Sequence, residues 1–163
     1  FFYFVFFLFF FIPSSILSAE ENVVFIDLNY VLNKSNVGKK ILDELNVINE
    51  KNKEKFSNEE SLLEKERNDI KKLKNIISKD EYNNKVALFR EKVEAYNTKK
   101  KNIIKSFENK KKQKLDIFFK DLNDIMNIYM KENSISIIID KKNVVMASIK
   151  NDISKDIIEL VNK

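Results

Sequence analysis

The sequence predicts an α+β protein in which a small β-sheet head carries a long antiparallel coiled-coil helical hairpin. Three observations lead to this fold class. The 163 residues include only one Gly and one Pro, so a fold of many short elements lacks the turn residues it needs. Residues 36–132 are rich in Lys, Glu, Asn, Leu and Ile, as helices are. Short β-branched runs stand near both ends of the chain.

The residue types that are absent exclude most catalytic chemistry. The chain has no Cys, no His and no Trp, which rules out disulfides, zinc fingers and nucleophile pairs that rely on His. With Gly38 as its single glycine, the chain also lacks the glycine-rich loops that hold nucleotide phosphates. We therefore expect a protein that is not an enzyme and that uses no cofactor and no metal.

The first nineteen residues predict a cleaved secretory signal peptide. An unbroken apolar run from Phe1 to Ile12 is followed by Pro13, then by Ala19, and then by two acidic residues. A retained membrane anchor is the alternative, although twelve apolar residues fall short of the roughly 20 that a spanning helix needs. Export would place the protein in an oxidising compartment.

The head is expected to comprise residues 20–35 and 133–163. Residues 22–28, 134–140 and 143–149 predict three strands, and the turn formers Asp140 and Asn143 predict an antiparallel hairpin between the last two. A short helix should follow over 152–162, capped by Asn151 or Asp152. Its predicted apolar face comprises Ile153, Ile157, Leu160 and Val161.

The arm is expected over residues 36–132, with its tip near 76–82. Ser78 and Glu81 match a capping box, which predicts that a second helix begins near residue 79. A continuous helix is the alternative, because no Gly or Pro marks a break. We prefer a reversal, since only a reversal brings the second strand back beside the first.

A narrow apolar seam is expected between the two arm helices. From 82 to 114, ten positions alternate steps of four and three residues, and seven of them are apolar. In the first helix the seam is interrupted by Glu59 and Glu66, so the coiled coil should be loose. The apolar candidates for packing and for exposure to a bound partner are Phe56, Leu63, Ile70, Leu73, Phe89, Val93, Tyr96, Ile103 and Phe107.

Lysine clusters in the outer part of the arm suggest attraction of anionic partners. Residues 99–114 hold eight Lys and one acid, and residues 70–79 hold four Lys and no acid. A solvated face is the plainer interpretation, while steering of acidic polypeptides, anionic lipid or lipopolysaccharide is the functional one. Export argues against nucleic acid as a partner. The candidate steering residues are Lys71, Lys72, Lys74, Lys99, Lys100, Lys101, Lys110, Lys111, Lys112 and Lys114.

A three-stranded sheet with apolar faces cannot bury them alone, so the head should be an obligate oligomer. The candidate oligomer contacts lie on the predicted strands: Val24, Ile26, Ile137, Ile139, Val144 and Met146.

The segment from Val23 to Lys40 contains Asp27, Ser35 and Gly38 in characteristic places, and near the other end an alternating strand at 135–140 is followed by Asp152-Ile153-Ser154. With these motifs both ends of the chain resemble the Skp (OmpH-like) family of periplasmic chaperones, although Ser154 stands where the family usually has Thr.

This resemblance implies a homotrimer in which the strands of three subunits form a β-barrel head and three helical hairpins surround a cavity. It implies an ATP-independent periplasmic holdase that keeps unfolded outer-membrane proteins from aggregating. An exported structural or adhesive coiled coil without chaperone activity is the main alternative, and a cytosolic nucleic-acid binder would require the signal prediction to be wrong.

Overall fold

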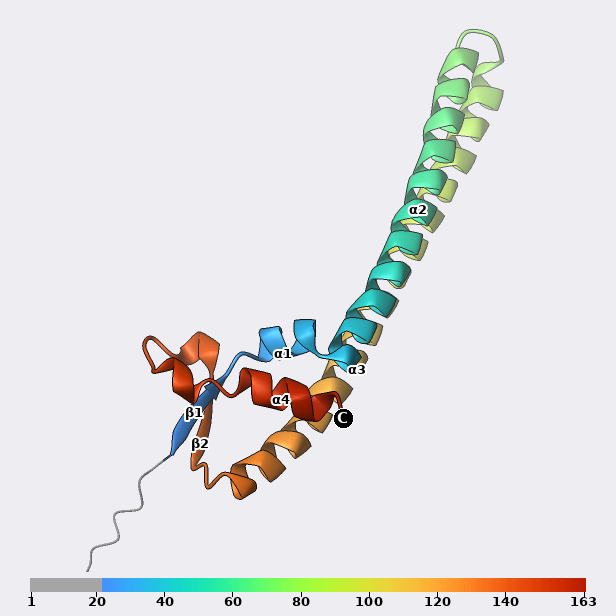
Figure 1. Ribbon diagram of the computed structural model, residues 1–163. Helices are drawn as coiled ribbons and strands as arrows, with labels where there is room; N and C mark the ends of the chain where they lie inside the picture. The colour runs from blue at the N-terminus through green and yellow to red at the C-terminus, as the bar shows by residue number, and fades with distance from the viewer. Residues whose placement is uncertain (1–21) are drawn as a thin grey trace, which may run out of the picture.

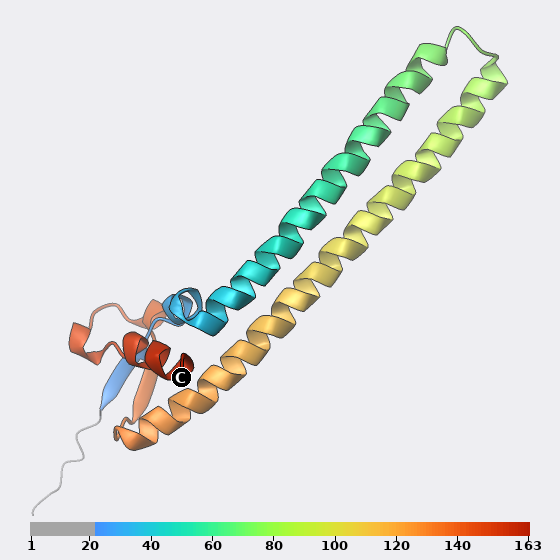
Figure 2. The same cartoon turned by 45° about the vertical axis from the view of Figure 1, so that its right-hand side comes forward.

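The computed structural model describes residues 22–163; the predicted signal peptide over 1–19 lies outside them. The protein has a small head from which two long helices run side by side (Figures 1 and 2). The elements follow in the order β1 (Val23–Ile26), α1 (Leu28–Lys34), α2 (Asn36–Leu73), α3 (Lys79–Glu132), β2 (Ile137–Asp140), the 3-10 turns η1 (Lys141–Asn143) and η2 (Ile149–Asn151), and α4 (Ser154–Val161).

The sheet joins the two ends of the arm. Strands β1 and β2 pair in parallel, with Val23 beside Ile137 at one end of the register and Ile26 beside Asp140 at the other. A parallel pair needs a long crossover connection, and here the whole hairpin of α2 and α3 provides it. The prediction that the first two strands share a sheet is therefore confirmed.

The predicted third strand over 143–149 is wrong for the single chain. Within residues 22–163 the sheet has two strands, and residues 144–148 form an irregular segment between η1 and η2. The expected hairpin turn is the 3-10 turn η1 instead, in which the Asp140 side chain accepts a hydrogen bond from the Lys142 amide. A strand needs a neighbour for its backbone hydrogen bonds, and residues 144–148 pair with neither β1 nor β2.

Helix α1 was not predicted, and it takes Leu28 out of the expected first strand. The Asp27 side chain caps α1 by accepting a hydrogen bond from the Tyr30 amide at 2.9 Å. Ser35 then ends α1 and caps α2, since its Oγ accepts a hydrogen bond from the Gly38 amide at 3.2 Å. Two successive caps thus turn the chain from the sheet into the arm.

The arm reverses at Lys74–Ser78, slightly before the expected tip at 76–82, because Ser78 already caps α3. Ser78 Oγ accepts a hydrogen bond from the Glu81 amide, and Glu81 Oε2 accepts one from the Ser78 amide, both at 3.3 Å. The capping box is confirmed, and a continuous helix is excluded. At 1.5 Å per residue, the 38 residues of α2 and the 54 of α3 span about 57 and 81 Å.

The buried core lies where the head meets the base of α3. Phe118 and Leu122 of α3 pack with residues of the sheet, α1 and α4, and the cluster comprises Val24, Ile26, Val31, Leu32, Phe118, Leu122, Ile135, Ile153 and Ile157. The predicted apolar face of α4 is confirmed, since Leu160 and Val161 pack against the same cluster.

The cap of α4 differs from the expectation. The N-cap position is Ile153, which has no side-chain cap, while Asp152 accepts a hydrogen bond from the Ser154 amide at 3.0 Å. Helix α4 therefore begins two residues later than expected, and Asp152 stabilises its start from just outside the helix.

Candidate functional site

The seam between α2 and α3 is half-open along most of the arm. On α3, eight successive predicted seam positions from Tyr82 to Phe107 are half-buried, whereas their neighbours on either side are exposed. All nine residues predicted to line the arm are half-buried as well. Between residues 46 and 117 no residue of the arm is buried; the buried apolar residues of α2 and α3, which are Leu45, Phe118 and Leu122, all lie near the base of the arm. A two-helix interface leaves its seam in partial contact with solvent, and this seam could therefore contact a partner.

Acidic residues in the seam pair with lysines of the other arm. Glu59 and Glu66, which interrupt the apolar pattern of α2, accept hydrogen bonds from Lys99 and Lys92 at 2.6 Å each. These pairs bridge the helices at the edge of the seam, where exposed ion pairs contribute at most about 1 kcal/mol each. The arms are thus joined by contacts that are individually weak.

A third bridge combines polar and aromatic contacts. Glu60 accepts hydrogen bonds from the Tyr96 hydroxyl and from Lys100 Nζ, both at 2.6 Å. The Lys100 ammonium also lies 5.3 Å from the centre of the Phe56 ring. The bond from Lys100 and, to a smaller extent, the bond from Tyr96 lower the pKa of Glu60. The bond to Glu60 in turn raises the pKa of Lys100.

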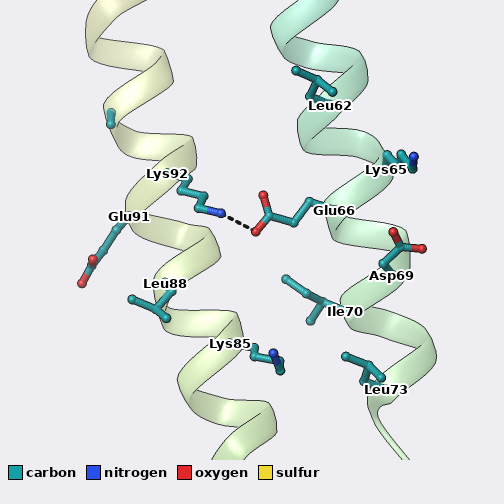
Figure 3. A pocket seen from close by; sticks show the side chains of 11 residues that line it. Leu62, Lys65, Glu66, Asp69, Ile70, Leu73, Lys85, Leu88, Glu91 and Lys92 are labelled. Carbon is teal, nitrogen blue, oxygen red and sulfur yellow. Dashed lines mark hydrogen bonds and ion pairs between the residues drawn. The ribbon is translucent and has the colours of Figure 1, made fainter.

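Open grooves flank the seam on the outer half of the arm, and Figure 3 shows the residues that line the larger one. The larger encloses about 810 Å³ and is crossed by the pair of Lys92 and Glu66. The exposed side chains of Leu62 and Leu88 line it. A second groove of about 340 Å³ also includes Leu62, so the two form one surface. We call this surface the arm groove; its residues are Glu59, Leu62, Leu63, Lys65, Glu66, Asp69, Ile70, Leu73, Lys85, Leu88, Glu91, Lys92, Ala95, Tyr96 and Lys99.

The sequence prediction of lining residues missed Leu62 and Leu88. They are 67% and 52% exposed, although each stands directly beside a seam position, Leu63 or Phe89. Their signal in the sequence is an apolar residue one step off the heptad pattern, at a position that a coiled coil normally gives to polar groups. They widen the seam into an apolar surface on one side of the arm.

Acidic residues of α2 neutralise the charge of some of the predicted steering lysines by forming ion pairs with them. Lys99, Lys100 and Lys114 form ion pairs with acids of α2 at 2.6 Å, and the partner of Lys114 is Glu44. Nearer the tip, Lys72 pairs with Asp69. The remaining predicted steering residues have exposed side chains: Lys71, Lys74, Lys101, Lys110, Lys111 and Lys112. The local excess of charge is therefore smaller than the run of lysines in α3 suggests.

The predicted oligomer contacts fall into two groups. Val24 and Ile26 are buried in the core of their own chain, so their side chains do not form a free surface. Ile139 and Val144 are half-buried, whereas Ile137 and Met146 are exposed. Two further exposed apolar residues of the same region, Val145 and Ile149, were not among the predicted contacts.

A polar cluster holds the head together beneath this exposed segment. Ser154 Oγ accepts a hydrogen bond from the Asp27 amide at 2.8 Å and donates one to Asp152. Lys141 lies 3.7 Å from the Asp27 carboxylate and 3.6 Å from that of Asp152. Burial acts to raise the pKa of Asp152, but the bonds from Ser154 and the charge of Lys141 outweigh it, so the pKa is lowered.

Residues 22–163 contain neither a candidate metal-ion site nor a candidate membrane-spanning helix. These residues contain no group of three or more acidic side chains placed to hold a metal ion. None of their helices combines the length and the apolar character needed to cross a membrane.

The fold and the arm define a class of proteins in which a small α/β head carries a long, half-open helical hairpin. This chain belongs to the OmpH-like family, because the model of that family, described as outer membrane protein (OmpH-like), matches residues 22–161. A search of curated proteins finds no match.

A solved structure shares the fold. It is the crystal structure of a candidate outer membrane chaperone (OmpH-like) from Caulobacter crescentus CB15. The two chains superimpose with a TM-score of 0.76 at 20% sequence identity, over 87% of this chain and 84% of the other. The arrangement of head and arm is thus shared even though the sequences have diverged.

Proposed function

We propose that this protein is an ATP-independent periplasmic holdase that binds unfolded outer-membrane proteins between helical arms and prevents their aggregation. The observation that carries this proposal is the half-open seam, with its nine half-buried apolar residues and the arm groove beside it. Membership of the OmpH-like family and the candidate chaperone that shares the fold support the same role.

The seam suits a client that has no fixed structure. An unfolded β-barrel protein exposes alternating apolar residues, and each of them gains a little free energy when it covers part of a half-exposed side chain such as Leu62 or Leu88. Many weak contacts of this kind hold a chain without requiring a particular sequence. The exposed lysines would add steering of acidic segments, an effect that falls as salt is added.

Assembly into a homotrimer would complete the head. Residues 144–149 expose Val145, Met146 and Ile149 to solvent, and large exposed apolar patches mark interaction sites. In the proposed trimer, this segment pairs with the head of a neighbouring subunit, so the strand predicted over 143–149 forms on assembly. Three arms would then enclose one cavity.

The proposed location depends on the start of the chain, which lies outside the described residues. The apolar run from Phe1 to Ile12 predicts export, and outer-membrane proteins cross the periplasm unfolded. Cell fractionation tests this step separately from client binding.

The main experiment measures aggregation of a urea-unfolded outer-membrane barrel protein after dilution, with and without this protein. We expect suppression at a trimer excess, together with a complex of defined mass. A variant with Leu62→Asn and Leu88→Asn should suppress aggregation several-fold less well. The matched control carries Ile117→Asn and Ile128→Asn, which change residues that are 61% and 58% exposed but lie outside the arm groove.

Two outcomes would contradict the proposal. Unchanged aggregation with the wild-type protein would favour the alternative of an exported structural coiled coil. Equal losses in the two double variants would show that exposed apolar residues act without regard to the arm groove.

A further inference from the structure

We propose that Met146 is a redox-sensitive modification site, at which oxidation to methionine sulfoxide by hypochlorous acid keeps a subunit from joining the oligomer. The effect on assembly rests on the trimer proposed above, whereas the exposure of the sulfur is a property of the single chain. Met146 belongs to the loop between η1 and η2, which lies on the side of the head away from the arm (Figures 1 and 2).

The three methionines of the chain differ in their access to solvent. Because the sequence has no Cys, these residues hold all of its sulfur. Met126 and Met130 of α3 are half-buried and pack against the core cluster, whereas Met146 is 92% exposed. Oxidation of a sulfur-containing side chain follows its exposure, so Met146 should be the first methionine of a free subunit to react.

The fold itself keeps Met146 in contact with solvent. The Val144 amide donates a hydrogen bond to the Lys141 carbonyl at 3.0 Å, which closes η1 on one side of the loop. On the other side, the Asn151 side chain ties η2 to the sheet by donating a hydrogen bond to the Val23 carbonyl at 3.2 Å. The exposed thioether is therefore held between two anchored turns of the folded head.

The reaction is a reversible two-electron oxidation at sulfur. The thioether sulfur attacks the chlorine of hypochlorous acid and releases hydroxide. Water then displaces chloride from the sulfur and loses two protons, one of which neutralises the hydroxide, so the products are the sulfoxide, chloride and one proton. A methionine sulfoxide reductase reverses the change: two thiols supply two electrons and form a disulfide, and the sulfoxide oxygen leaves as water.

The sulfoxide weakens the proposed contact between subunits. Met146 shares its surface with Val145 and Ile149, which are 102% and 81% exposed, and a neighbouring subunit covers these apolar side chains in the proposed trimer. Oxidation replaces the apolar thioether with a polar S=O group. Burial of that oxygen without a hydrogen-bond donor should weaken association roughly tenfold for each modified subunit.

Assembly should protect Met146 in return. A neighbouring subunit that covers the side chain also keeps the oxidant away from the sulfur, so the free subunit is the form that becomes modified. Oxidation and assembly thus compete for one surface. Exposure to the oxidant should stop new trimers from forming, while trimers that already exist persist.

The first experiment follows the oxidation of each methionine. The protein is treated with hypochlorous acid and quenched with free methionine, and mass spectrometry of its peptides gives the sulfoxide fraction at each position over time. In the variant Val145→Glu, which is expected not to assemble, Met146 should react several-fold faster than in the wild type. In the same variant it should also react several-fold faster than Met126 and Met130.

The second experiment measures assembly by light scattering. Wild-type protein that is oxidised in dilute solution and then concentrated should stay monomeric, and methionine sulfoxide reductase with a dithiol should restore the trimer. Met146→Leu keeps an apolar side chain of similar volume, so it should assemble and should withstand the oxidant. The control variant, with Met126→Leu and Met130→Leu, should remain as sensitive as the wild type.

A third variant separates polarity from other effects of the oxidant. Met146→Gln places a polar, unbranched side chain at the same position, and it should assemble roughly tenfold less tightly per subunit in the absence of any oxidant. Its helix content should equal that of the wild type, because the changed side chain is exposed in the single subunit.

Three results would each overturn the inference. They are equal oxidation rates of Met146 in the wild type and in Val145→Glu, a trimer that forms from fully oxidised Met146, and loss of assembly by oxidised Met146→Leu. The second of these would leave the proposed trimer and holdase intact. A wild type that is monomeric before oxidation would instead remove the proposed trimer, and this inference with it. Client aggregation is measured without oxidant, so Met146→Leu should suppress it as the wild type does whether or not oxidation controls assembly.

Discussion

Gly38 packs against the backbone at the end of α1. A Cβ built on it would lie 1.9 Å from the Leu32 carbonyl oxygen and 2.8 Å from Ser35 Oγ. Both neighbours are held in place, since Ser35 is buried and caps α2. We expect Gly38→Ala to destabilise the head by more than about 2 kcal/mol, because the backbone must shift to relieve the overlap. Urea unfolding measures the loss, and an unchanged midpoint would contradict the expectation. Ala87→Gly, at an exposed position inside α3, is the control and should cost only about 1 kcal/mol.

Tyr129 links the base of α3 to α4, and it makes the stability of the fold vary with pH in the alkaline range. Its hydroxyl donates a hydrogen bond to Asp156 Oδ2 at 2.9 Å. Burial, and then this bond, raise the pKa of Tyr129 to about 12, so folding favours the protonated phenol. The free energy of unfolding that the protonated Tyr129 contributes is therefore fully present below pH 10, the ordinary pKa of tyrosine. It is lost as the pH rises from about 10 to 12.

Tyr129→Phe tests this linkage. It should cost about 1 kcal/mol at neutral pH and should abolish the part of the alkaline loss that belongs to this residue. Thermal unfolding of both proteins between pH 8 and 12 measures the difference. Tyr82→Phe, at the far end of the arm, should leave the wild-type profile intact; identical profiles for Tyr129→Phe and wild type would refute the linkage.

At the scale of single residues, the sequence pattern singled out Asp27, Ser35 and Gly38 but did not show what each of them does in the fold. Their roles come from contacts between residues far apart in the chain, such as the bond from the Asp27 amide to Ser154. Helix α1 was missed for a related reason. Its seven residues are too few to show a helical period, and only the caps at its two ends define it.

The elements of the arm could be predicted almost completely. Heptad spacing and a capping box are local features, so the seam from Tyr82 to Phe107 and the start of α3 followed from the sequence. The cross-arm pairs could not be predicted, because the register between α2 and α3 decides which Glu meets which Lys. The sequence showed Glu59 and Glu66 as defects in the seam, whereas the structure shows them as partners of Lys99 and Lys92.

These two seam acids allow the looseness of the arm to be tested. A variant with Glu59→Leu and Glu66→Leu fills the seam, and we expect it to stabilise the arm by about 1 kcal/mol per site. A closed seam offers less apolar surface, so client holding should fall as stability rises, as happens at sites built for binding. Thermal melting of the helices and the aggregation assay measure the two effects.

The matched control for the seam variant is Glu54→Leu, which adds the same side chain at an exposed position of α2. It should change neither the melting temperature nor the activity by much. If filling the seam raised stability and left client holding intact, clients would not contact the seam, and the exposed Leu62 and Leu88 beside it would remain as the candidate surface.

At the scale of the whole molecule, the main buried core of one chain is confined to the head and the base of α3. The strand predicted over 143–149 does not form there, since within residues 22–163 the sheet has two strands. Sequence patterns show that a segment prefers to be a strand, but they do not say which chain supplies its partner. The failure of the third strand in a single subunit is thus the feature that the proposed trimer explains best.

The assembly can be tested at the most exposed part of the head. Val145 and Met146 are 102% and 92% exposed, so changing them costs the isolated subunit almost nothing. A variant with Val145→Glu and Met146→Glu should therefore keep its helix content but fail to assemble, because two charges would be buried in the interface. Light scattering should give a trimer mass for the wild type and a monomer mass for the variant.

The wild type should also melt at a temperature that rises with protein concentration, as folding linked to association requires. Ile128→Glu, which changes an exposed residue of α3 outside this segment, should remain a trimer. A wild-type protein that is a stable monomer at micromolar concentration would remove the basis for a shared head.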